Sequence, residues 1–269
     1  MNKARRNTKK NKALKAFMAL TALTAMFLIS PVQAKEYDGI WFMGMNLKST
    51  VLKDLKVREA VNLAIDKEYI VKKIVSEEVV PVGFVPFGMI GYDPDLPFKF
   101  QDIKAAKELM KNAGYSMADP RIKDLSLLHT DGLLTIEIAK KIQSDLRNIG
   151  MKVNLTEVSY QNEDKWVEEL TSGKHDFFLL GYKAGIEQLF TTEEAATQID
   201  SVSLIEPLFR SGGDVNFTGY SNPEVDKLLD QLEGINMALK SERHAKLKKI
   251  NQILYQDQPA VVLFYIEKL

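Results

Sequence analysis

Several residue types and patterns are missing from this 269-residue chain. It contains no cysteine, which excludes a disulfide framework, a thiolate metal site and a lipid-anchored lipoprotein. No apolar run reaches the roughly 20 residues that a comfortable membrane-spanning helix needs. Without disulfides or a thiolate metal site, the fold must depend on an ordinary apolar core, for which a chain of this length is sufficient.

Motifs of catalysis and nucleotide binding are missing as well. The chain has no G-x-S-x-G, H-E-x-x-H or G-x-G-x-x-G pattern and no phosphate-binding P-loop. Its three histidines are scattered. His129 is the last residue of a predicted strand, near the place where a sheet would bind a ligand, although an ordinary hydrogen-bonded loop histidine is the more common alternative. The sequence therefore predicts no enzyme activity, no metal and no cofactor.

The first 34 residues have the layout of a secretory signal. Residues 1–15 hold seven basic side chains and no acidic one, and residues 16–29 are apolar apart from two threonines. Residues 32–34, Val-Gln-Ala, place small side chains at the two positions that a signal peptidase recognises. We therefore predict export to the periplasm by a cleavable signal peptide of residues 1–34. An uncleaved N-terminal anchor is the alternative.

The charge balance changes once this leader is set aside. The whole chain has 36 basic and 36 acidic residues, so without the seven leader cations residues 35–269 carry 29 against 36, a net charge of about −7. A mildly acidic exported protein is a poor candidate for binding nucleic acid or an anionic membrane surface. We predict no nucleic-acid partner.

Residues 125–180 alternate between strand and helix patterns. Apolar segments predict strands at 125–129, 152–158 and 176–180. Two amphipathic helices are predicted between them from apolar residues spaced three or four apart: Leu133, Ile136, Ala139, Ile142, Leu146 and Ile149 in the first, and Trp166, Val167 and Leu170 in the second. This order predicts a parallel sheet, whose ligands bind beyond the carboxyl ends of the strands. A candidate site therefore lies at residues 181–187.

The flanking segments extend the same α/β pattern. Strands are predicted at 40–47 and 259–266, a helix at 239–255, and a long ordered loop at 79–98. Further helices are predicted from residues that favour helix starts: Asp54, Asp66, Asp102 and Asn222 followed by Pro223.

Five segments, in order along the chain, carry recognisable motifs. They are KVREA with AIDKEYI (56–60 and 64–70), DIKAAKEL with AGY (102–109 and 113–115), IQSDL with IGMKV (142–146 and 149–153), GKHDF (173–177), and Asn216 with GYSNP and Asp226 (219–226). Together they resemble the extracellular solute-binding proteins that serve peptide and nickel ABC importers.

The resemblance implies a single α/β lobe of the type II periplasmic-binding architecture, with a mostly parallel sheet flanked by helices, over residues 35–269. Family members usually carry a few hundred residues before the first of these motifs. The chain therefore looks like the C-terminal lobe with the N-terminal lobe absent. The implied function is the periplasmic solute-binding component of an ABC importer, which captures a peptide or similar solute for the permease.

The predicted ligand-binding residues are Phe84, Pro86, His129, Tyr182, Lys183, Gly185, Glu187 and Asn216. Residues 84–87 and Tyr182 are expected to form an apolar face toward the absent lobe. The family usually has a tryptophan and, in its peptide-binding members, an aspartate that neutralises the peptide amino terminus. Tyr182 and Gly185 stand at these positions. Glu187 could replace the aspartate, and the alternative is a loop that has drifted after losing its role.

Three hypotheses follow for the function. The first is a solute-binding component of an importer, completed by a separate N-terminal lobe or by self-association. The second is a non-transport interaction or sensory module, and the third is a degenerate gene fragment without ligand binding. A partner lobe that purifies with the chain favours the first hypothesis. A stable monomer with a polar ligand-side face favours the second, and poor solubility with molten behaviour favours the third.

Overall fold

The computed structural model describes residues 35–185 and 200–268. The chain divides into the units Met1–Lys35 and Glu36–Leu269, and the description below concerns the second. The predicted leader and Glu187 lie outside the described residues.

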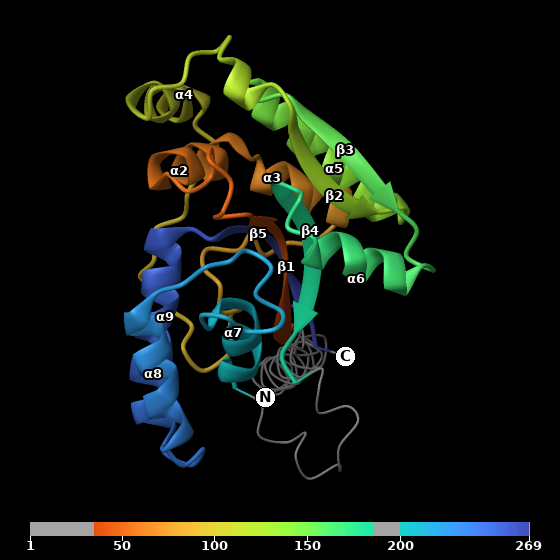
Figure 1. The fold of residues 1–269 in the computed structure, drawn as a ribbon. Coiled ribbons are helices and arrows are strands. Elements are labelled where there is room, and N and C mark those ends of the chain that lie inside the picture. Colours follow the sequence, from red (N-terminus) through yellow and green to blue (C-terminus); the bar gives the residue numbers. More distant parts are fainter. Residues whose placement is uncertain (1–34, 186–199, 269) are drawn as a thin grey trace, which may run out of the picture. The chain divides into compact units, whose positions relative to one another are not determined.

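The strands are β1 (Tyr37–Met45), β2 (Leu125–Thr130), β3 (Val153–Val158), β4 (Phe177–Lys183) and β5 (Ala260–Glu267). The helices and helical turns are α2 (Leu55–Ala64), α3 (Lys67–Tyr69), η1 (Ile70–Val75), α4 (Ile103–Asn112), η2 (Pro120–Ile122), α5 (Leu133–Arg147), α6 (Glu163–Thr171), α7 (Val202–Phe209), α8 (Pro223–Glu233) and α9 (Lys240–Asp257) (Figure 1).

The five described strands form one sheet in the order β3-β2-β4-β1-β5. β2 pairs parallel with both β3 and β4, which confirms the parallel arrangement predicted for residues 125–180. β1 pairs antiparallel with β4 and with β5, so the sheet is mixed rather than mostly parallel. The direction of a strand depends on the end of the sheet at which the chain enters, and the residues of β1 themselves contain no signal for it.

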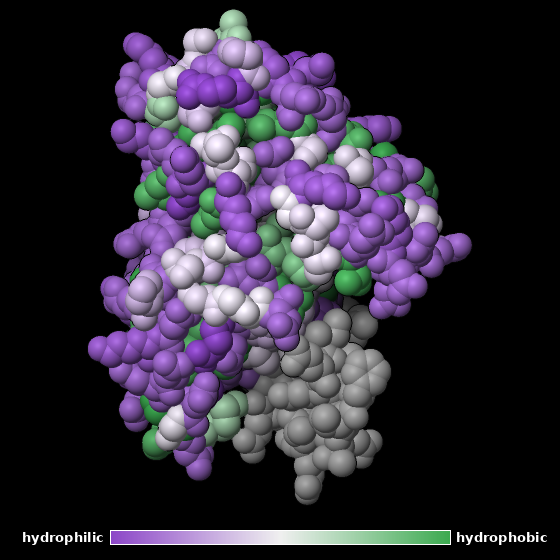
Figure 2. All heavy atoms as spheres, viewed as in Figure 1, coloured by the Kyte–Doolittle hydropathy of each residue, from purple (hydrophilic) through white to green (hydrophobic). Residues whose placement is uncertain are grey.

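Side chains of the sheet alternate between two apolar cores. Phe177 and Leu179 of β4 belong to the first core, together with residues of α2, α4 and α5. Phe178, between them in sequence, belongs to the second core, together with residues of α7, α8 and α9. Neighbouring side chains of a strand point to opposite faces, so the continuous apolar run of β4 is buried on both sides, as predicted. The exterior seen in Figure 2 is largely hydrophilic, with smaller hydrophobic areas.

Four predicted helix starts are confirmed by side-chain caps. Each cap accepts a hydrogen bond of 2.9–3.0 Å from a main-chain N–H two or three residues further on. The caps are Asp54 for α2, Asp66 for α3, Asp102 for α4 and Asn222 for α8. Residues 79–98 form no helix or strand, as predicted.

Two helix faces differ from the prediction, and one helix was missed. Leu133 opens α5 but is 84% exposed, and Val167 of α6 is 48% exposed. Ala139, Ile142 and Leu146 are buried as predicted, and Ile138 joins them on the inward face of α5. α7 was not predicted, and it contains Pro207, which cannot donate a helical hydrogen bond. Within the described ranges, no helix combines the length and apolarity needed to cross a bilayer.

Candidate functional site

The three parallel strands end at a common edge of the sheet, which we call the carboxyl edge. β2 ends at Thr130, β3 at Val158 and β4 at Lys183. The antiparallel pairing places the start of β1 and the end of β5 at the same edge, because Gly39 lies opposite Lys183 and Tyr37 opposite Glu267. Ligands of open α/β sheets bind beyond such an edge.

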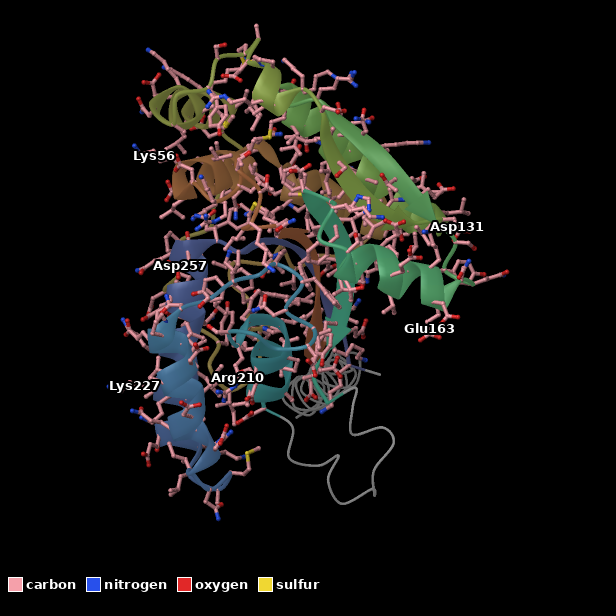
Figure 3. The ribbon with its side chains drawn as sticks, in the orientation of Figure 1. Lys56, Asp131, Glu163, Arg210, Lys227 and Asp257 are labelled. Atoms are coloured by element: carbon pink, nitrogen blue, oxygen red, sulfur yellow. The ribbon has the colours of Figure 1, made fainter. Side chains whose placement is uncertain are left out.

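The loops after β2 and β3 are joined by one carboxylate. Asp131 accepts a hydrogen bond of 2.9 Å from the main-chain N–H of Tyr160, and its own N–H donates to the carbonyl of Val158 at 3.1 Å. The bond from Tyr160 and a further one from the Ser159 side chain hold the pKa of Asp131 below its usual value. Figure 3 labels Asp131, just after β2, and Glu163, where α6 begins after β3. The two loops therefore form one connected surface.

Exposed apolar side chains gather on this surface. Leu133 is 84% exposed, Leu134 41% and Tyr160 65%. α5 begins here after Gly132, which has no side chain to cap the free N–H groups of the first turn. Apolar contact area beside unsatisfied N–H donors suits a ligand that has apolar side chains and a carboxylate or carbonyl oxygen.

The corner formed by β4 and β1 holds a local ion pair. The Lys183 ammonium lies 3.3 Å from the carboxylate of Asp38 and donates to the carbonyl of Glu267, also at 3.3 Å. Gly185 follows with a φ of +70°, a left-handed conformation that glycine adopts without a steric penalty. This backbone conformation favours a glycine at position 185.

The structure places Phe84, Pro86 and Tyr182, three further predicted site residues, in the protein interior. Phe84 and Pro86 are buried, and the ring of Phe84 packs edge-on against Phe209 with centroids 5.1 Å apart. Tyr182 is 8% exposed and also belongs to the second core. The expectation that these three side chains form an open apolar face is therefore wrong, because loop 79–98 packs onto the second core. Only Phe87 of residues 84–87 is exposed, at 50%.

His129 and Asn216 are both occupied within the protein. The ring of His129 is 2% exposed, and its Nδ1 lies 2.8 Å from the carbonyl oxygen of Thr130. The Asn216 amide donates to the carbonyls of Arg210 and Tyr220 at 2.9 and 2.8 Å. Asn216 thus organises the loop before α8. Across residues 35–185 and 200–268, no group of three or more histidine or acidic side chains could hold a metal ion.

Comparison with known proteins decides the family. The model of the bacterial extracellular solute-binding proteins, family 5, middle part, matches residues 5–189. The chain belongs to this family. Its members are binding proteins rather than enzymes. Among curated relatives, the oligopeptide-binding protein OppA of Bacillus subtilis is 25% identical over 237 residues, and the glutathione-binding protein GsiB of Escherichia coli K12 is 27% identical over 233 residues.

Solved structures agree with this family in fold. The murein tripeptide-binding protein MppA of E. coli superimposes with a TM-score of 0.72 at 20% identity, over 90% of this chain and 46% of that protein. AppA of B. subtilis, solved with a nonapeptide, gives 0.69 at 23% identity, over 86% and 45%. OppA and GsiB are covered over 40% and 42% of their lengths, against 84% and 85% of this chain. The chain therefore spans less than half the length of these relatives.

Family motifs far apart in sequence converge on the end of α9. The Arg58 guanidinium donates to the carbonyl of Asp257 from Nε at 2.9 Å and from Nη2 at 2.7 Å. The carboxylate of Asp257 accepts from the hydroxyl of Tyr220 at 2.6 Å and from the amide of Asn222 at 2.8 Å. Burial lowers the pKa of Arg58, and burial together with the Asp257 contact raises the pKa of Tyr220. Figure 3 labels Asp257 at this end of α9.

Two more motif carboxylates hold loops in place. Asp145 of α5, 3% exposed, accepts from the N–H of Asp66 at 3.0 Å and from the ammonium of Lys141 at 2.6 Å. Asp176, which precedes β4, accepts from the Ser49 hydroxyl at 2.9 Å and from the N–H of Ser126 at 3.0 Å. The contacts made by these motif residues build the scaffold of the family fold.

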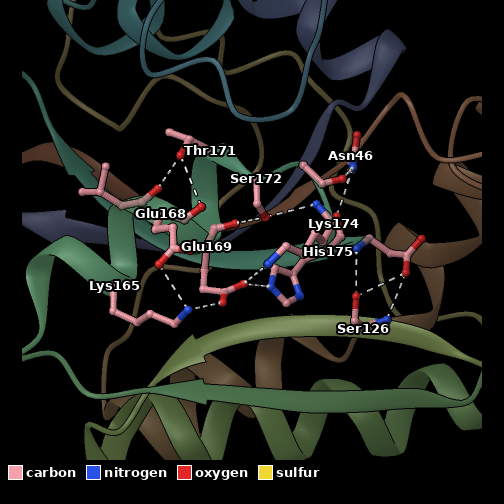
Figure 4. Close-up of polar contacts among 12 residues, drawn as sticks. Asn46, Ser126, Lys165, Glu168, Glu169, Thr171, Ser172, Lys174 and His175 are labelled. Atoms are coloured by element: carbon pink, nitrogen blue, oxygen red, sulfur yellow. Dashed lines mark hydrogen bonds and ion pairs between the residues drawn. The ribbon is translucent and has the colours of Figure 1, made fainter.

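α6 and the turn that joins it to β4 together hold an ionisable cluster (Figure 4). The carboxylate of Glu169 lies 2.8 Å from the Lys165 ammonium and 2.9 Å from Nε2 of His175. The hydrogen bond from Lys165, followed by that from His175, lowers the pKa of Glu169 to about 2. Because this folded-state pKa lies below the usual glutamate value of 4.5, the charged form stabilises the fold above pH 4.5, and the stabilisation is lost as the pH falls toward 2.

Replacing Glu169 should therefore have a pH-dependent effect. We expect Glu169→Gln to lower the urea midpoint at pH 7 and the difference from wild type to shrink as the pH falls to 3, measured by fluorescence-detected unfolding. Glu137→Gln, on the exposed face of α5, is the matched control and should show no such trend. A difference for Glu169→Gln that stays constant with pH would contradict the ionic role.

Proposed function

We propose that this chain is the solute-binding component of an ABC importer and that it binds a peptide or similar solute at its carboxyl edge. The observation that carries the proposal is the group of exposed side chains Leu133, Leu134 and Tyr160 beside the uncapped first turn of α5. Side chains of a peptide would lie on the apolar residues, and its carboxylate or carbonyl groups would accept from the free N–H groups. The names of OppA and GsiB, which describe oligopeptide and glutathione binding, support this class of solute.

A solute on this edge needs a second wall. Small-molecule sites usually bury about 70–90% of the ligand, whereas the edge residues Leu133 and Tyr160 are mostly exposed. We propose that a further lobe, or a second copy of this chain, closes over the carboxyl edge. Without it, polar contacts compete with water and the affinity for a peptide is low.

The same exposed residues favour a second candidate function. An apolar surface that binds no solute is typical of a protein–protein contact, so the carboxyl edge could serve an interaction or sensory module. The two candidates differ in whether a small molecule accompanies the protein.

Calorimetric titration with glutathione and with tri- to pentapeptides that have free termini tests solute binding at the carboxyl edge. We expect the double variant Leu133→Ser with Tyr160→Ala to raise the Kd for the bound peptide at least tenfold, because it removes most of the exposed apolar surface there. Leu239→Ala, at a residue that is 52% exposed before α9, is the control and should bind as wild type does. Unchanged affinity in the double variant would place the solute elsewhere.

Native mass spectrometry of the protein from its own cells distinguishes the two candidates. For the importer component we expect a mass excess of a few hundred daltons or a complex with a second lobe, and a chain that begins at Lys35 if the predicted leader is removed. A bare monomer that also fails to bind any peptide in the calorimetric titration would favour the interaction module.

A further inference from the structure

A groove of about 1010 Å³ lies between α4 and the chain that follows it, residues 114–117. We call it the α4 groove. It lies at the end of the sheet opposite the carboxyl edge, because these residues lead into the first residue of β2, Leu125, and pack near Gly150, just before β3. It is therefore separate from the proposed solute site.

The floor of the α4 groove is apolar and well anchored. Met110, Tyr115 and Ile149 line it and are 3%, 8% and 1% exposed, so the core holds them in place. Met117 stands at the rim and is 49% exposed. The groove thus offers an apolar strip together with one protruding, adaptable side chain.

The rim is held by the main chain around Met117. The Lys123 ammonium donates to the carbonyls of both Met117 and Gly150, the latter at 2.7 Å. Gly150 has a φ of +89°, and a Cβ atom there would lie 3.0 Å from the Cα atom of Met117. The rim therefore has a defined position against which a ligand can bind.

One wall of the groove is positively charged. Lys104, Lys107 and Lys111 of α4 are all exposed and line the groove. Their spacing of three and four residues places them on one face of the helix, over about 10 Å of its axis. None of the three makes an ion pair or side-chain hydrogen bond with another described residue. Glu108 of α4 is also exposed and lines the groove, so the four charged side chains of this wall carry a net charge of about +2, in a chain whose residues 35–269 carry about −7.

We propose that the α4 groove binds an acidic amphipathic helix of a partner protein. Apolar side chains of that helix would lie on Met110, Tyr115 and Met117, and its acidic side chains, spaced three or four residues apart, would pair with the lysines. A partner helix that lies along α4 presents a side chain to it every three or four residues. This is also the spacing of the three lysines, so acidic residues of the partner can face them. Two other ligands fit the groove less well than a helix. A membrane surface is flat and does not enter a concave groove. A small anionic amphiphile has a single charged group and cannot pair with all three lysines.

The experiment uses synthetic 14-residue peptides labelled with fluorescein. The first has leucines on one helical face and glutamates spaced at i, i+3 and i+7 beside it, and the second has lysines in place of the glutamates. Fluorescence anisotropy with the full chain should show at least tenfold tighter binding of the acidic peptide at low salt. The affinity should fall at least fivefold at 300 mM NaCl, because salt screens the exposed charges.

Variants of the chain locate the contact. Exchanging Lys104, Lys107 and Lys111 for glutamate should abolish binding of the acidic peptide, and Met117→Ala should weaken it severalfold. The matched control changes the same number of exposed lysines elsewhere, Lys73, Lys227 and Lys240, to glutamate and should bind as wild type does. Far-UV circular dichroism verifies that each variant is folded.

Three outcomes would overturn the proposal. They are equal binding of the acidic and basic peptides, equal loss in the test and control triple variants, and binding only to vesicles with 30% phosphatidylglycerol. Tyr160→Ala at the carboxyl edge should leave binding of the acidic peptide unchanged. Failure of this proposal and failure of the solute proposal are therefore distinguishable.

Discussion

Replacing Arg58 by alanine should lower the free energy of unfolding by about 3–5 kcal/mol. The guanidinium donates to three main-chain carbonyls, those of Leu52 at 3.1 Å, Lys53 at 3.0 Å and Asp257 at 2.7 Å. Arg58 is 7% exposed, so water cannot readily replace the lost donors. Urea unfolding measures the effect as a lower midpoint with an unchanged slope.

Two further variants test whether the loss of stability comes from the several hydrogen bonds that the Arg58 guanidinium donates. Arg58→Lys keeps the charge but cannot reach three carbonyls at once, so we expect an intermediate loss of about 2 kcal/mol. Arg147→Ala, at an exposed position at the end of α5, should cost less than about 0.5 kcal/mol. If the alanine variants of Arg58 and Arg147 lost the same free energy of unfolding, the hydrogen bonds between Arg58 and the end of α9 would contribute nothing to stability.

Phe42→Ala should destabilise the protein by about 3–5 kcal/mol, because it leaves a cavity beside the central strand. Phe42 of β1 is 1% exposed and lies opposite Leu180 of β4 and Val262 of β5. Its ring also meets that of Phe178 edge-on, with centroids 6.1 Å apart. Thermal unfolding followed by calorimetry measures the loss.

The matched control for Phe42 is Phe100→Ala. Phe100 is 63% exposed, and its ring contacts only the neighbouring Phe98 among the ring contacts of the described residues. We expect a change below about 1 kcal/mol there. A Phe42 variant as stable as the Phe100 variant would mean that β1 does not lie between β4 and β5 in solution.

The scaffold positions two surfaces at opposite ends of the sheet. The carboxyl edge presents exposed apolar residues and the uncapped start of α5, whereas the α4 groove presents an apolar strip with a wall of lysines. The buried network around Asp257 and the carboxylates Asp145 and Asp176 lie in the body that carries both surfaces. Changes at one surface can therefore be tested while the other is measured as a control.

The candidate site could be predicted from sequence only in part. The strand–helix order of residues 125–180 correctly predicts the edge at which the parallel strands end, and Lys183 and Gly185 do lie there. Burial of Phe84, Pro86 and Tyr182 could not be foreseen, because an apolar residue in a long loop is compatible with either an exposed face or a core. The exposure of Leu133 could not be foreseen either, since its helical spacing also fits an inward position.

The sequence by itself determined the local elements and the family. Caps such as Asp54 and Asn222 act within two or three residues, and the motifs are contiguous, so both are visible without knowledge of contacts. Only the tertiary structure decided which motif residues meet. Arg58 reaches Asp257 across 199 positions, and β1 joins β4 and β5 in a direction that its own residues do not encode. Such contacts depend on which distant surfaces bury one another, and a local pattern contains no information about its partner.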